Sequence, residues 1–149
     1  MGINIRPFNL KKDLERVYKI EVKSFRYPWS KRSFVIALKV GAQIDVAEIN
    51  DVVVGFAVYR IEHSMDAILG HLLNIAVDPD YRAKGIGTLL LKSFEGYCKE
   101  NGAEYAYLEV RTSNKGAIQF YKKNGYQVWG IKERYYSNGE DAIVMMKKL

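Results

Sequence analysis

Residues 72–101 read LLNIAVDPDYRAKGIGTLLLKSFEGYCKEN, and this stretch decides the fold. Its apolar run at 72–77 is typical of a strand buried on both faces, and Asp78-Pro79-Asp80 is typical of a turn. The apolar spacing from Thr88 to Asn101 predicts a helix. A strand that leads through a glycine-rich turn into a helix forms an anion-binding site, because the first N–H groups of the helix have no intrahelical partner.

The turn from Arg82 to Gly87 carries the features that a phosphate ligand needs. Gly85 and Gly87 allow a ligand to approach the backbone closely, and Arg82 and Lys84 add positive charge. The dipole of the following helix adds about half a positive charge at its N-terminus. We therefore predict a phosphate ester at this turn, although the turn alone fits a nucleotide, a dinucleotide or a sugar phosphate.

The composition predicts one globular domain, residues 1–149, which is long enough to bury a full core. The net charge of +6 suits a polyanionic ligand, but the Lys and Arg residues are scattered, so we expect no dedicated nucleic-acid surface. Cys98 is the only cysteine, which excludes an internal disulfide, and we expect no metal site. We expect a cytoplasmic location, with no signal peptide and no membrane-spanning segment.

The hydrophobic pattern of the whole chain predicts an α/β fold with the element order β-α-α-β-β-β-α-β-α-β-β. The early strands form an antiparallel meander, whereas the strand-helix-strand unit at 67–110 requires a parallel crossover. The expected strands are residues 3–6, 44–49, 52–61, 67–77, 105–110, 127–134 and 142–147, and the expected helices are residues 10–25, 30–39, 88–101 and 114–124. The buried face of the third helix is expected to carry Ile86, Leu89, Leu90, Phe94 and Tyr97.

A second motif, LEVRTSNKGAIQFYKKNGY at residues 108–126, accompanies the glycine-rich turn. Together with the R-x-x-G-x-G pattern at 82–87, it resembles the GNAT acetyltransferase superfamily, in particular its RimI-type and archaeal Ard1-like N-alpha-acetyltransferases. The loop Tyr27-Pro28-Trp29-Ser30 and the segment from Arg134 to Ala142 are similar to the same group. The resemblance implies a mixed, mostly antiparallel sheet of about seven strands, with four helices on both faces.

The resemblance implies that acetyl-CoA is the cofactor and that it binds three parts of the chain. The backbone of a bulged strand would hold the pantetheine arm and polarise the thioester carbonyl, at Ile75, Ala76 and Val77. The pyrophosphate would bind the turn residues Arg82, Ala83, Lys84, Gly85, Ile86, Gly87 and Thr88. Ala83 stands where an Arg is frequent in the family. Asn114 would contact the CoA arm from the start of the fourth helix, although it also suits an N-cap.

Three side chains have catalytic roles in this resemblance: Glu109 as general base, Tyr121 as general acid beside the CoA sulfur, and His71 in proton transfer or water ordering. Each also has a structural alternative. Glu109 would pair with Arg111 or Lys115 at the edge of the sheet. Tyr121 would be a core tyrosine with a backbone partner, and His71 a strand histidine with satisfied ring nitrogens.

Glu21 lies on the inward stripe of the first helix, where we expect a structural hydrogen-bond acceptor rather than a base. Some relatives carry a catalytic Pro-Glu pair in the loop after this helix. Here the loop reads Tyr-Pro-Trp, which favours the RimI-like arrangement. Because adjacent strand residues point to opposite faces, we expect only one of Tyr135 and Tyr136 to line a groove.

The resemblance implies that the substrate is the N-terminal amine of a ribosomal protein or of a nascent chain, and it leaves ribosome association open. The groove for that substrate would be flanked by Tyr27, Pro28, Trp29, Tyr135 and Tyr136. We expect direct attack on acetyl-CoA in a ternary complex, without an acyl-enzyme. Acetylation of lysine side chains or small amines stays an alternative, as does a non-catalytic CoA-binding regulatory module. The oligomeric state is open.

Overall fold

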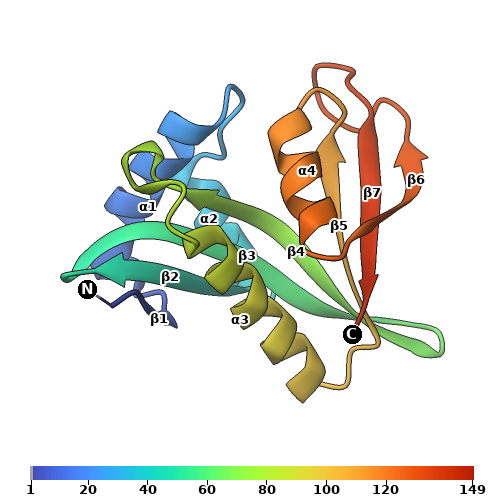
Figure 1. Cartoon of the computed structure of the whole chain (residues 1–149), viewed down its shortest axis with the longest axis horizontal. Helices are drawn as coiled ribbons and strands as arrows, with labels where there is room; N and C mark the ends of the chain where they lie inside the picture. Colours follow the sequence, from blue (N-terminus) through green and yellow to red (C-terminus); the bar gives the residue numbers. More distant parts are fainter. Residues whose placement is uncertain (1) are drawn as a thin grey trace. The chain divides into compact units, whose positions relative to one another are not determined.

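The chain forms the predicted order of strands and helices, with one additional short 3-10 helix (Figure 1). The computed structural model describes residues 2–149. The strands are β1 (Asn4–Pro7), β2 (Gln43–Ile49), β3 (Val52–Ser64), β4 (Ala67–Val77), β5 (Tyr105–Arg111), β6 (Gln127–Lys132) and β7 (Ala142–Lys148). The helices are α1 (Leu10–Ser24), α2 (Lys31–Lys39), η1 (Pro79–Tyr81), α3 (Ile86–Glu100) and α4 (Lys115–Lys123).

The strands within residues 2–149 form a seven-stranded sheet in the order β1-β2-β3-β4-β5-β7-β6. The ladders β1–β2, β2–β3, β5–β7 and β6–β7 are antiparallel, whereas β4 and β5 pair in parallel. A parallel pair needs a crossover connection, which α3 provides between β4 and β5. The predicted mixed and mostly antiparallel sheet is therefore confirmed.

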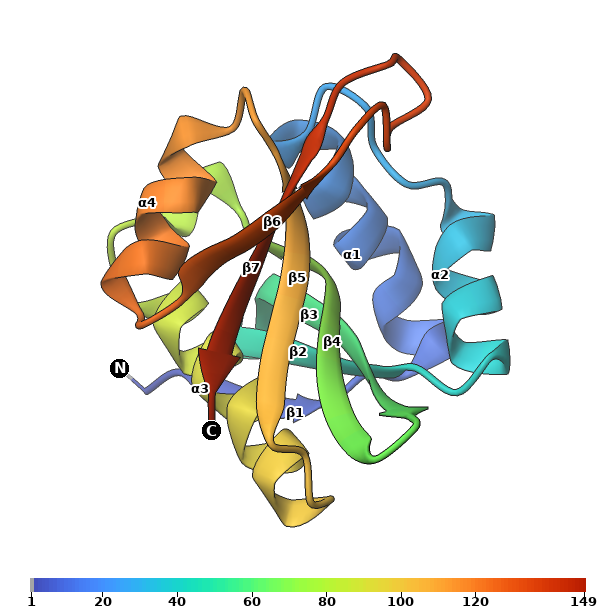
Figure 2. The same cartoon turned by 90° about the vertical axis from the view of Figure 1, so that its right-hand side faces the viewer.

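Two compact units make up the chain, and both β3 and β4 contribute residues to each of them. The first unit comprises residues 1–60 and 73–97, and the second comprises residues 61–72 and 98–149. In the first unit, α1 and α2 cover one face of β2 and β3, and α3 covers the other (Figures 1 and 2). Within residues 2–149, no helix has the length and the apolar character that crossing a membrane requires.

The core under α1 and α2 is built from apolar side chains of these helices and of β2 and β3. Ile20 of α1 is fully buried, and Phe34 of α2 packs edge-to-face on Phe56 of β3 with ring centroids 5.4 Å apart. Such an aromatic pair contributes about 0.5–1.5 kcal/mol beyond the area that it buries. The Ser30 side chain accepts the N–H of Ser33, so α2 begins at the predicted cap.

Glu21 is buried on α1 and connects the loop before α2 to β4. Its Oε2 accepts the backbone N–H of Trp29 at 2.9 Å, and its Oε1 accepts the side-chain amide of Asn74 at 2.8 Å. Burial raises the pKa of Glu21, although both hydrogen bonds favour the ionised form. Glu21 is therefore the structural acceptor that the sequence predicts.

The face that α3 buries differs in part from the prediction. Leu89 is exposed, whereas Leu90 and Leu91 are buried, so the buried arc of the helix is rotated toward Leu91. A Cβ atom on Gly55 of β3 would lie 3.1 Å from the Ala76 carbonyl oxygen and 3.1 Å from Leu90 Cδ1. A glycine at this position therefore allows α3 to pack directly on β3.

The apolar run of β4 is buried less completely than the sequence predicts. Leu72 and Ala76 are buried, but Leu73, Ile75 and Val77 are only partly buried. Alternate residues of a strand point to opposite faces, and in this part of β4 only one face is fully covered. The expectation of burial on both faces is therefore wrong for residues 73–77.

Asp78 follows β4 and holds the start of the turn that leads to α3. It is buried, and its carboxylate accepts the Asp80 N–H at 3.0 Å and an Arg16 N–H at 2.5 Å. Burial raises the pKa of Asp78, but the hydrogen bonds from Asp80 and Arg16 outweigh burial and hold the pKa below its ordinary value. The ionised carboxylate thus anchors the chain immediately before the glycine-rich turn.

We expect the substitution Asp78→Asn to lower the free energy of unfolding by about 1–3 kcal/mol at pH 7, because Arg16 loses a charged acceptor. The folded-state pKa of Asp78 is lowered, so its stabilisation is present above the unfolded pKa and is lost as the pH falls through the folded pKa. Urea unfolding at pH values from 7 down to 3 should show the difference between variant and wild type shrinking. A difference that stays constant over this range would contradict the assignment.

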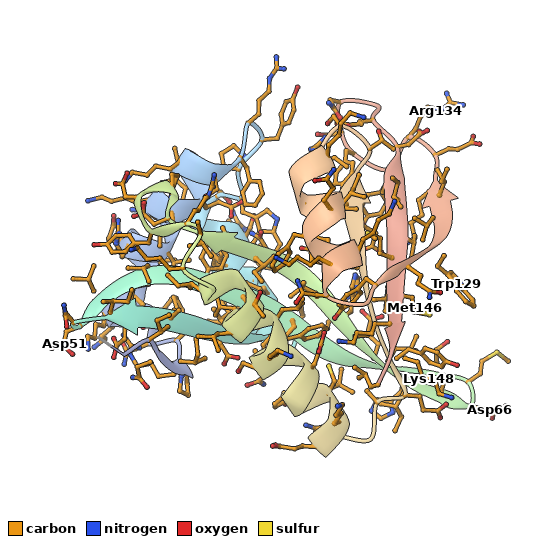
Figure 3. All side chains as sticks on the ribbon, viewed as in Figure 1. Asp51, Asp66, Trp129, Arg134, Met146 and Lys148 are labelled. Carbon is orange, nitrogen blue, oxygen red and sulfur yellow. The ribbon has the colours of Figure 1, made fainter. Side chains whose placement is uncertain are left out.

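In the second unit, α4 covers one face of β5, β7 and β6 (Figures 1 and 2). The strand β6 ends at Lys132, two residues before the predicted end at Arg134. Arg134 has a φ of +49°, a left-handed conformation that an extended strand does not permit. The register of β6 shifts between Val128 and Gly130, and the exposed Trp129 at this shift points away from the sheet (Figure 3).

Candidate active site

A chain of hydrogen bonds connects five polar side chains of the second unit. The Tyr107 hydroxyl donates to Glu62 Oε1, and Glu62 Oε2 lies 2.8 Å from Nδ1 of His71. On the other side of the imidazole ring, Nε2 lies 2.6 Å from Glu109 Oε1. Glu109 Oε2 accepts a hydrogen bond of 2.8 Å from Lys132 Nζ. Two predicted catalytic residues, His71 and Glu109, are therefore in direct contact.

The parallel ladder between β4 and β5 positions these groups. His71 of β4 lies opposite Tyr107 of β5, and the two rings stack with centroids 4.1 Å apart and an interplanar angle of 15°. Glu109 follows Tyr107 by two residues, so the strand directs both side chains to the same face. Ala106 and Leu108 lie on the opposite face of β5 and are buried.

Glu109 is enclosed, with only 7% of its side chain exposed. Burial raises the pKa of Glu109, but the hydrogen bonds from His71 and Lys132 outweigh burial, so the pKa lies below the ordinary glutamate value. The hydrogen bond with Glu109 raises the pKa of Lys132. Glu109 is therefore ionised at neutral pH, and it is a weak proton acceptor.

Glu109 is paired with a lysine that its structural alternative did not name, Lys132. Burial raises the pKa of Glu109, and the side-chain hydrogen bonds that lower it come from His71 and Lys132, whereas Arg111 donates to Glu140 Oε1 at 3.1 Å. The alternative reading of His71 is right in one respect, since both of its ring nitrogens have hydrogen-bond partners. Both partners are carboxyl groups, and this arrangement suits proton transfer as well as structure.

Sequence reasoning did not single out Glu62, Tyr107 or Lys132. The two-residue spacing of Tyr107 and Glu109 on one strand was the signal that could have identified Tyr107. No local pattern points to Glu62 or Lys132, because they reach the site from β3 and β6 through the pairing of distant strands.

Tyr121 is buried in α4, and its ring packs on that of Tyr126 with centroids 5.8 Å apart. Burial raises the pKa of the Tyr121 hydroxyl well above the ordinary tyrosine value, and the nearby Tyr136 adds to this effect. The hydroxyl therefore stays protonated at neutral pH and can donate a hydrogen bond. Asn114 caps α4 by accepting the Ala117 N–H at 3.2 Å, while its contact with CoA stays a prediction.

Tyr135 and Tyr136 lie in the loop after β6, so the expectation that a strand sends them to opposite faces is wrong. Their rings pack edge-to-face with centroids 5.0 Å apart. The Arg111 guanidinium lies 3.9 Å from the centroid of the Tyr136 ring, and burial raises the pKa of Tyr136 to about 12. Lys132 Nζ lies 5.2 Å from the centroid of the Tyr135 ring, so both tyrosines border the hydrogen-bonded chain.

The glycine-rich turn belongs to the first unit and presents its backbone openly. Ala83 and Gly85 have φ angles of +63° and +79°, and α3 begins at Ile86 rather than at the predicted Thr88. A Cβ atom on Gly85 would meet no atom within 4 Å. Left-handed residues in a turn can direct successive N–H groups into one anion-binding concavity. The turn therefore fits the predicted phosphate group.

The two basic residues of this turn differ in their contacts. Arg82 Nε donates to the Val77 carbonyl oxygen at 3.2 Å, and Arg82 Nη2 lies 3.5 Å from Ser24 Oγ. Arg82 thus braces the end of β4, although both Arg82 and Lys84 are exposed. We expect the positive charge available to a ligand to come mainly from Lys84 and from the N-terminus of α3.

The loop at residues 27–29, also in the first unit, divides its side chains between core and surface. Trp29 is partly buried and packs on Phe34 with ring centroids 5.1 Å apart. Tyr27 and Pro28 are exposed, and the Arg26 guanidinium lies 5.5 Å from the centroid of the Tyr27 ring. Trp29 therefore has a structural task, and Tyr27 and Pro28 form the accessible part of the loop.

Sequence comparison finds relatives that span nearly the whole chain. The family model for the acetyltransferase (GNAT) family matches residues 14–126. The chain is 40% identical over 136 residues to a Bacillus subtilis protein provisionally named as a ribosomal protein bS18-alanine N-acetyltransferase, with 89% of this chain and 87% of that protein covered. It is 37% identical over 147 residues to the N-alpha-acetyltransferase of Sulfurisphaera tokodaii, with 92% and 88% covered.

Solved structures show the same fold. Ard1 from Thermoplasma volcanium has a TM-score of 0.89 and 30% identity, with 100% of this chain and 99% of that chain covered. Naa50 from Arabidopsis thaliana, solved with the bisubstrate analogue CoA-Ac-MVNAL, has a TM-score of 0.84 and 25% identity, with 100% of both chains covered. Since the family model matches most of its length, the chain belongs to the GNAT acetyltransferase family.

Proposed function

We propose that the protein is an acetyl-CoA-dependent N-alpha-acetyltransferase, which transfers an acetyl group to the N-terminal amine of a protein. The observation that carries this proposal is the buried carboxylate of Glu109, with its lowered pKa and its 2.6 Å contact with His71. The relatives that are named N-alpha-acetyltransferase support the substrate class.

The lowered pKa of Glu109 favours an α-amine over a lysine side chain as substrate. A peptide α-amine has a pKa near 8, so about a tenth of it is already neutral at pH 7, whereas well under a tenth of a percent of lysine amine is neutral. A weak base is sufficient for the α-amine, because only a modest free-energy cost separates its charged and neutral forms. The weakly basic carboxylate of Glu109 is therefore better suited to an α-amine than to a lysine side chain.

We infer that acetyl-CoA supplies the acetyl group as a thioester and that its pyrophosphate binds the turn from Arg82 to Thr88. The left-handed Gly85 and the N-terminus of α3 fit that anion. The backbone of Ile75 to Val77 would hold the pantetheine arm, and Asn114 would contact the CoA arm from its place at the start of α4. Backbone N–H groups would stabilise the oxyanion that forms on the acetyl carbonyl.

The proposed reaction is a direct attack in a ternary complex. The charged amine gives one proton to Glu109, which later returns it to solvent, and the neutral nitrogen then bonds to the acetyl carbon as the carbon–sulfur bond breaks. Tyr121, whose hydroxyl burial keeps protonated at neutral pH, acts as general acid and gives its proton to the departing thiolate. The second proton that the nitrogen loses as the amide forms replaces the proton of Tyr121. Cys98, the only thiol of the chain, is buried, which argues against an acyl-enzyme.

The substrate side of the proposal rests on residues of two loops, of which Tyr27, Pro28 and Tyr135 are exposed and Tyr136 is partly buried. We propose that Tyr27 and Pro28 of the first unit, and Tyr135 with Tyr136 of the second, contact the first residues of the substrate. Trp29 would support this loop from the core. The Bacillus subtilis relative is named for a ribosomal protein, so a ribosomal protein or a nascent chain in the cytoplasm is the substrate that we propose to test.

We expect the protein to release CoA thiol with short peptides that have a free N-terminus and no lysine. The same peptides with a blocked N-terminus and one internal lysine should react at least about a hundredfold more slowly at pH 7, because so little lysine amine is neutral. Thiol release and product mass measure both reactions, over a panel that varies the first two residues.

The same panel separates the alternatives. Acetylation at internal lysines only would favour the lysine acetyltransferase. Tight CoA binding without thiol release from any peptide or small amine would favour a non-catalytic CoA-binding module.

A further inference from the structure

Glu140 lies in the loop between β6 and β7, and its carboxyl group joins this loop to the end of β5 and the connection that follows it. Its Oε2 accepts the backbone N–H of Ser113 at 2.8 Å and the Thr112 hydroxyl at 3.3 Å. Its Oε1 accepts a hydrogen bond of 3.1 Å from Arg111 Nη1. One carboxyl group therefore binds three consecutive residues that are distant from it in the sequence.

These donors keep the carboxyl group of Glu140 ionised. Hydrogen bonds from the side chain and the backbone N–H of Ser113, together with those from Arg111 and Thr112, outweigh desolvation and lower the pKa of Glu140 to about 2. Hydrogen bonds to an ionised acceptor are stronger than those between neutral groups. The connection between the two segments therefore persists at every pH at which an acetyl transfer would be assayed.

The arginine that Glu140 binds lies against the ring of Tyr136. The centre of the Arg111 guanidinium is 3.9 Å from the centroid of that ring. Arg111 Nη1 also donates to Asn138 Oδ1 at 3.0 Å, so two acceptors of the β6–β7 loop orient its side chain. A planar guanidinium that is held in this way can stack on an aromatic ring and fix its orientation.

The backbone of the β6–β7 loop fixes Tyr136 independently of its ring. The Tyr136 N–H donates to the Glu140 carbonyl oxygen at 3.1 Å, and the Gly139 N–H donates to the Tyr136 carbonyl oxygen at 2.8 Å. Gly139 has a φ of +86°, which glycine adopts without strain in such a short turn. Glu140 therefore holds Tyr136 through its main chain and, by way of Arg111, through the ring.

The two segments that Glu140 joins carry groups that the proposed reaction needs, and both belong to the second unit. The segment after β5 leads to Asn114, which caps α4 and which we propose as a contact of CoA. The β6–β7 loop carries Tyr135 and Tyr136, the proposed substrate contacts, whose rings pack edge-to-face. A loop that is ordered before the substrate arrives loses less conformational entropy on binding, so the substrate binds more tightly.

We propose that Glu140 is a positioning residue for the substrate peptide, which acts through Arg111 to hold the ring of Tyr136, and with it that of Tyr135, in the orientation that the peptide contacts. The proposal rests on the proposed function and goes beyond it by assigning a task to the Arg111–Glu140 ion pair. Glu140 thereby affects the binding of the peptide rather than the chemical step.

The test compares Glu140→Gln with wild type. Glutamine keeps the size of the side chain and can still accept the Ser113 N–H, but as a neutral acceptor it holds Arg111 more weakly. We expect the KM for a peptide substrate to rise by roughly tenfold, with kcat and the KM for acetyl-CoA within about twofold of wild type. Steady-state thiol release over a range of both substrates measures the three values. Glu133→Gln, the same change at an exposed carboxyl group of the same loop, should behave as wild type.

A double-mutant cycle tests whether Glu140 acts through Tyr136. Tyr136→Ala alone should raise the KM for the peptide, because the ring that Arg111 orients is removed. Adding Glu140→Gln to this variant should then raise that KM little further, since two residues that act on one contact have non-additive effects. Arg111→Gln removes the cation itself and should give the same pattern, so it replaces Glu140→Gln if that variant does not fold. Thermal unfolding of each variant checks folding.

The outcomes separate the two proposals. Failure of wild type to acetylate any α-amine would refute the proposed function, and the positioning role with it. An active wild type whose peptide KM is unchanged in Glu140→Gln would refute the positioning role alone. Additive effects of Glu140→Gln and Tyr136→Ala would also refute it alone, as would equal changes in kcat and in both KM values, because these are the results that a merely structural carboxyl group would give.

Discussion

Replacing Glu109 with glutamine is expected to lower kcat by about 10²–10⁴-fold, the range that a general base contributes. Glutamine keeps the shape of the side chain and can still accept a hydrogen bond, but it cannot take the proton of the amine. The KM for acetyl-CoA should change little, because the predicted pyrophosphate contacts lie in a different segment of the chain. Steady-state thiol release over a range of both substrates measures the two parameters. Full turnover in this variant would remove Glu109 from the mechanism.

A variant at Lys132 provides the matched control for Glu109. Lys132→Gln keeps the carboxylate but removes the cation 2.8 Å away, which helps to hold the pKa of Glu109 low. The pKa of Glu109 should rise, so less of it is ionised at acidic pH and the acid limb of kcat/KM should move to higher pH. Near pH 8 the loss of activity should be much smaller than in Glu109→Gln. An acid limb that stays in place would show that this limb reports another group.

Replacing Gly85 with valine is expected to weaken acetyl-CoA binding by roughly tenfold or more, equivalent to about 1.4 kcal/mol. Gly85 has a φ of +79°, which a β-branched residue adopts only with strain, so the turn should also lose about 1–3 kcal/mol of stability. The Cβ of residue 85 would meet no protein atom within 4 Å. A loss of affinity would therefore report on the ligand and on the turn conformation, and not on a clash in the core. Calorimetric titration with CoA and thermal unfolding measure the two effects.

At Ala83, in the same turn, the reverse change can be tested, in which glycine replaces a residue that has a side chain. It already has a left-handed φ of +63°, so Ala83→Gly relieves backbone strain and should leave CoA binding within about twofold of wild type. Unchanged affinity in Gly85→Val, together with the expected loss of stability, would move the predicted pyrophosphate site away from this turn.

Local patterns in the sequence predicted the parts of the molecule that depend on neighbouring residues. The helix α2 begins at the Ser30 cap, and the glycine-rich turn leads into α3, because capping and positive φ angles are properties of a few consecutive residues. The buried arc of α3 was harder to predict, since Leu89 and Leu91 are equally apolar and only the packing of the helix on β3 decides which one is buried.

The end of β6 is a second feature that local sequence patterns did not predict. The predicted strand extends to Arg134, but Arg134 is left-handed, and Tyr135 and Tyr136 lie in a loop. Aromatic residues fit a strand and a packed loop equally well. Tyr136 contacts the Arg111 guanidinium only in the folded chain, because Arg111 belongs to β5.

By itself the sequence determined the family, the order of the elements, the glycine-rich turn before α3 and two of the groups of the candidate site, Glu109 and His71. Each of these lies in a continuous motif, so consecutive residues were enough to identify it. Only the tertiary structure decided which groups surround them. His71 is 9 residues from Glu62 and 38 from Glu109, and Lys132 is 23 residues from Glu109. Such contacts depend on strand order and register, which are set by packing across the whole sheet.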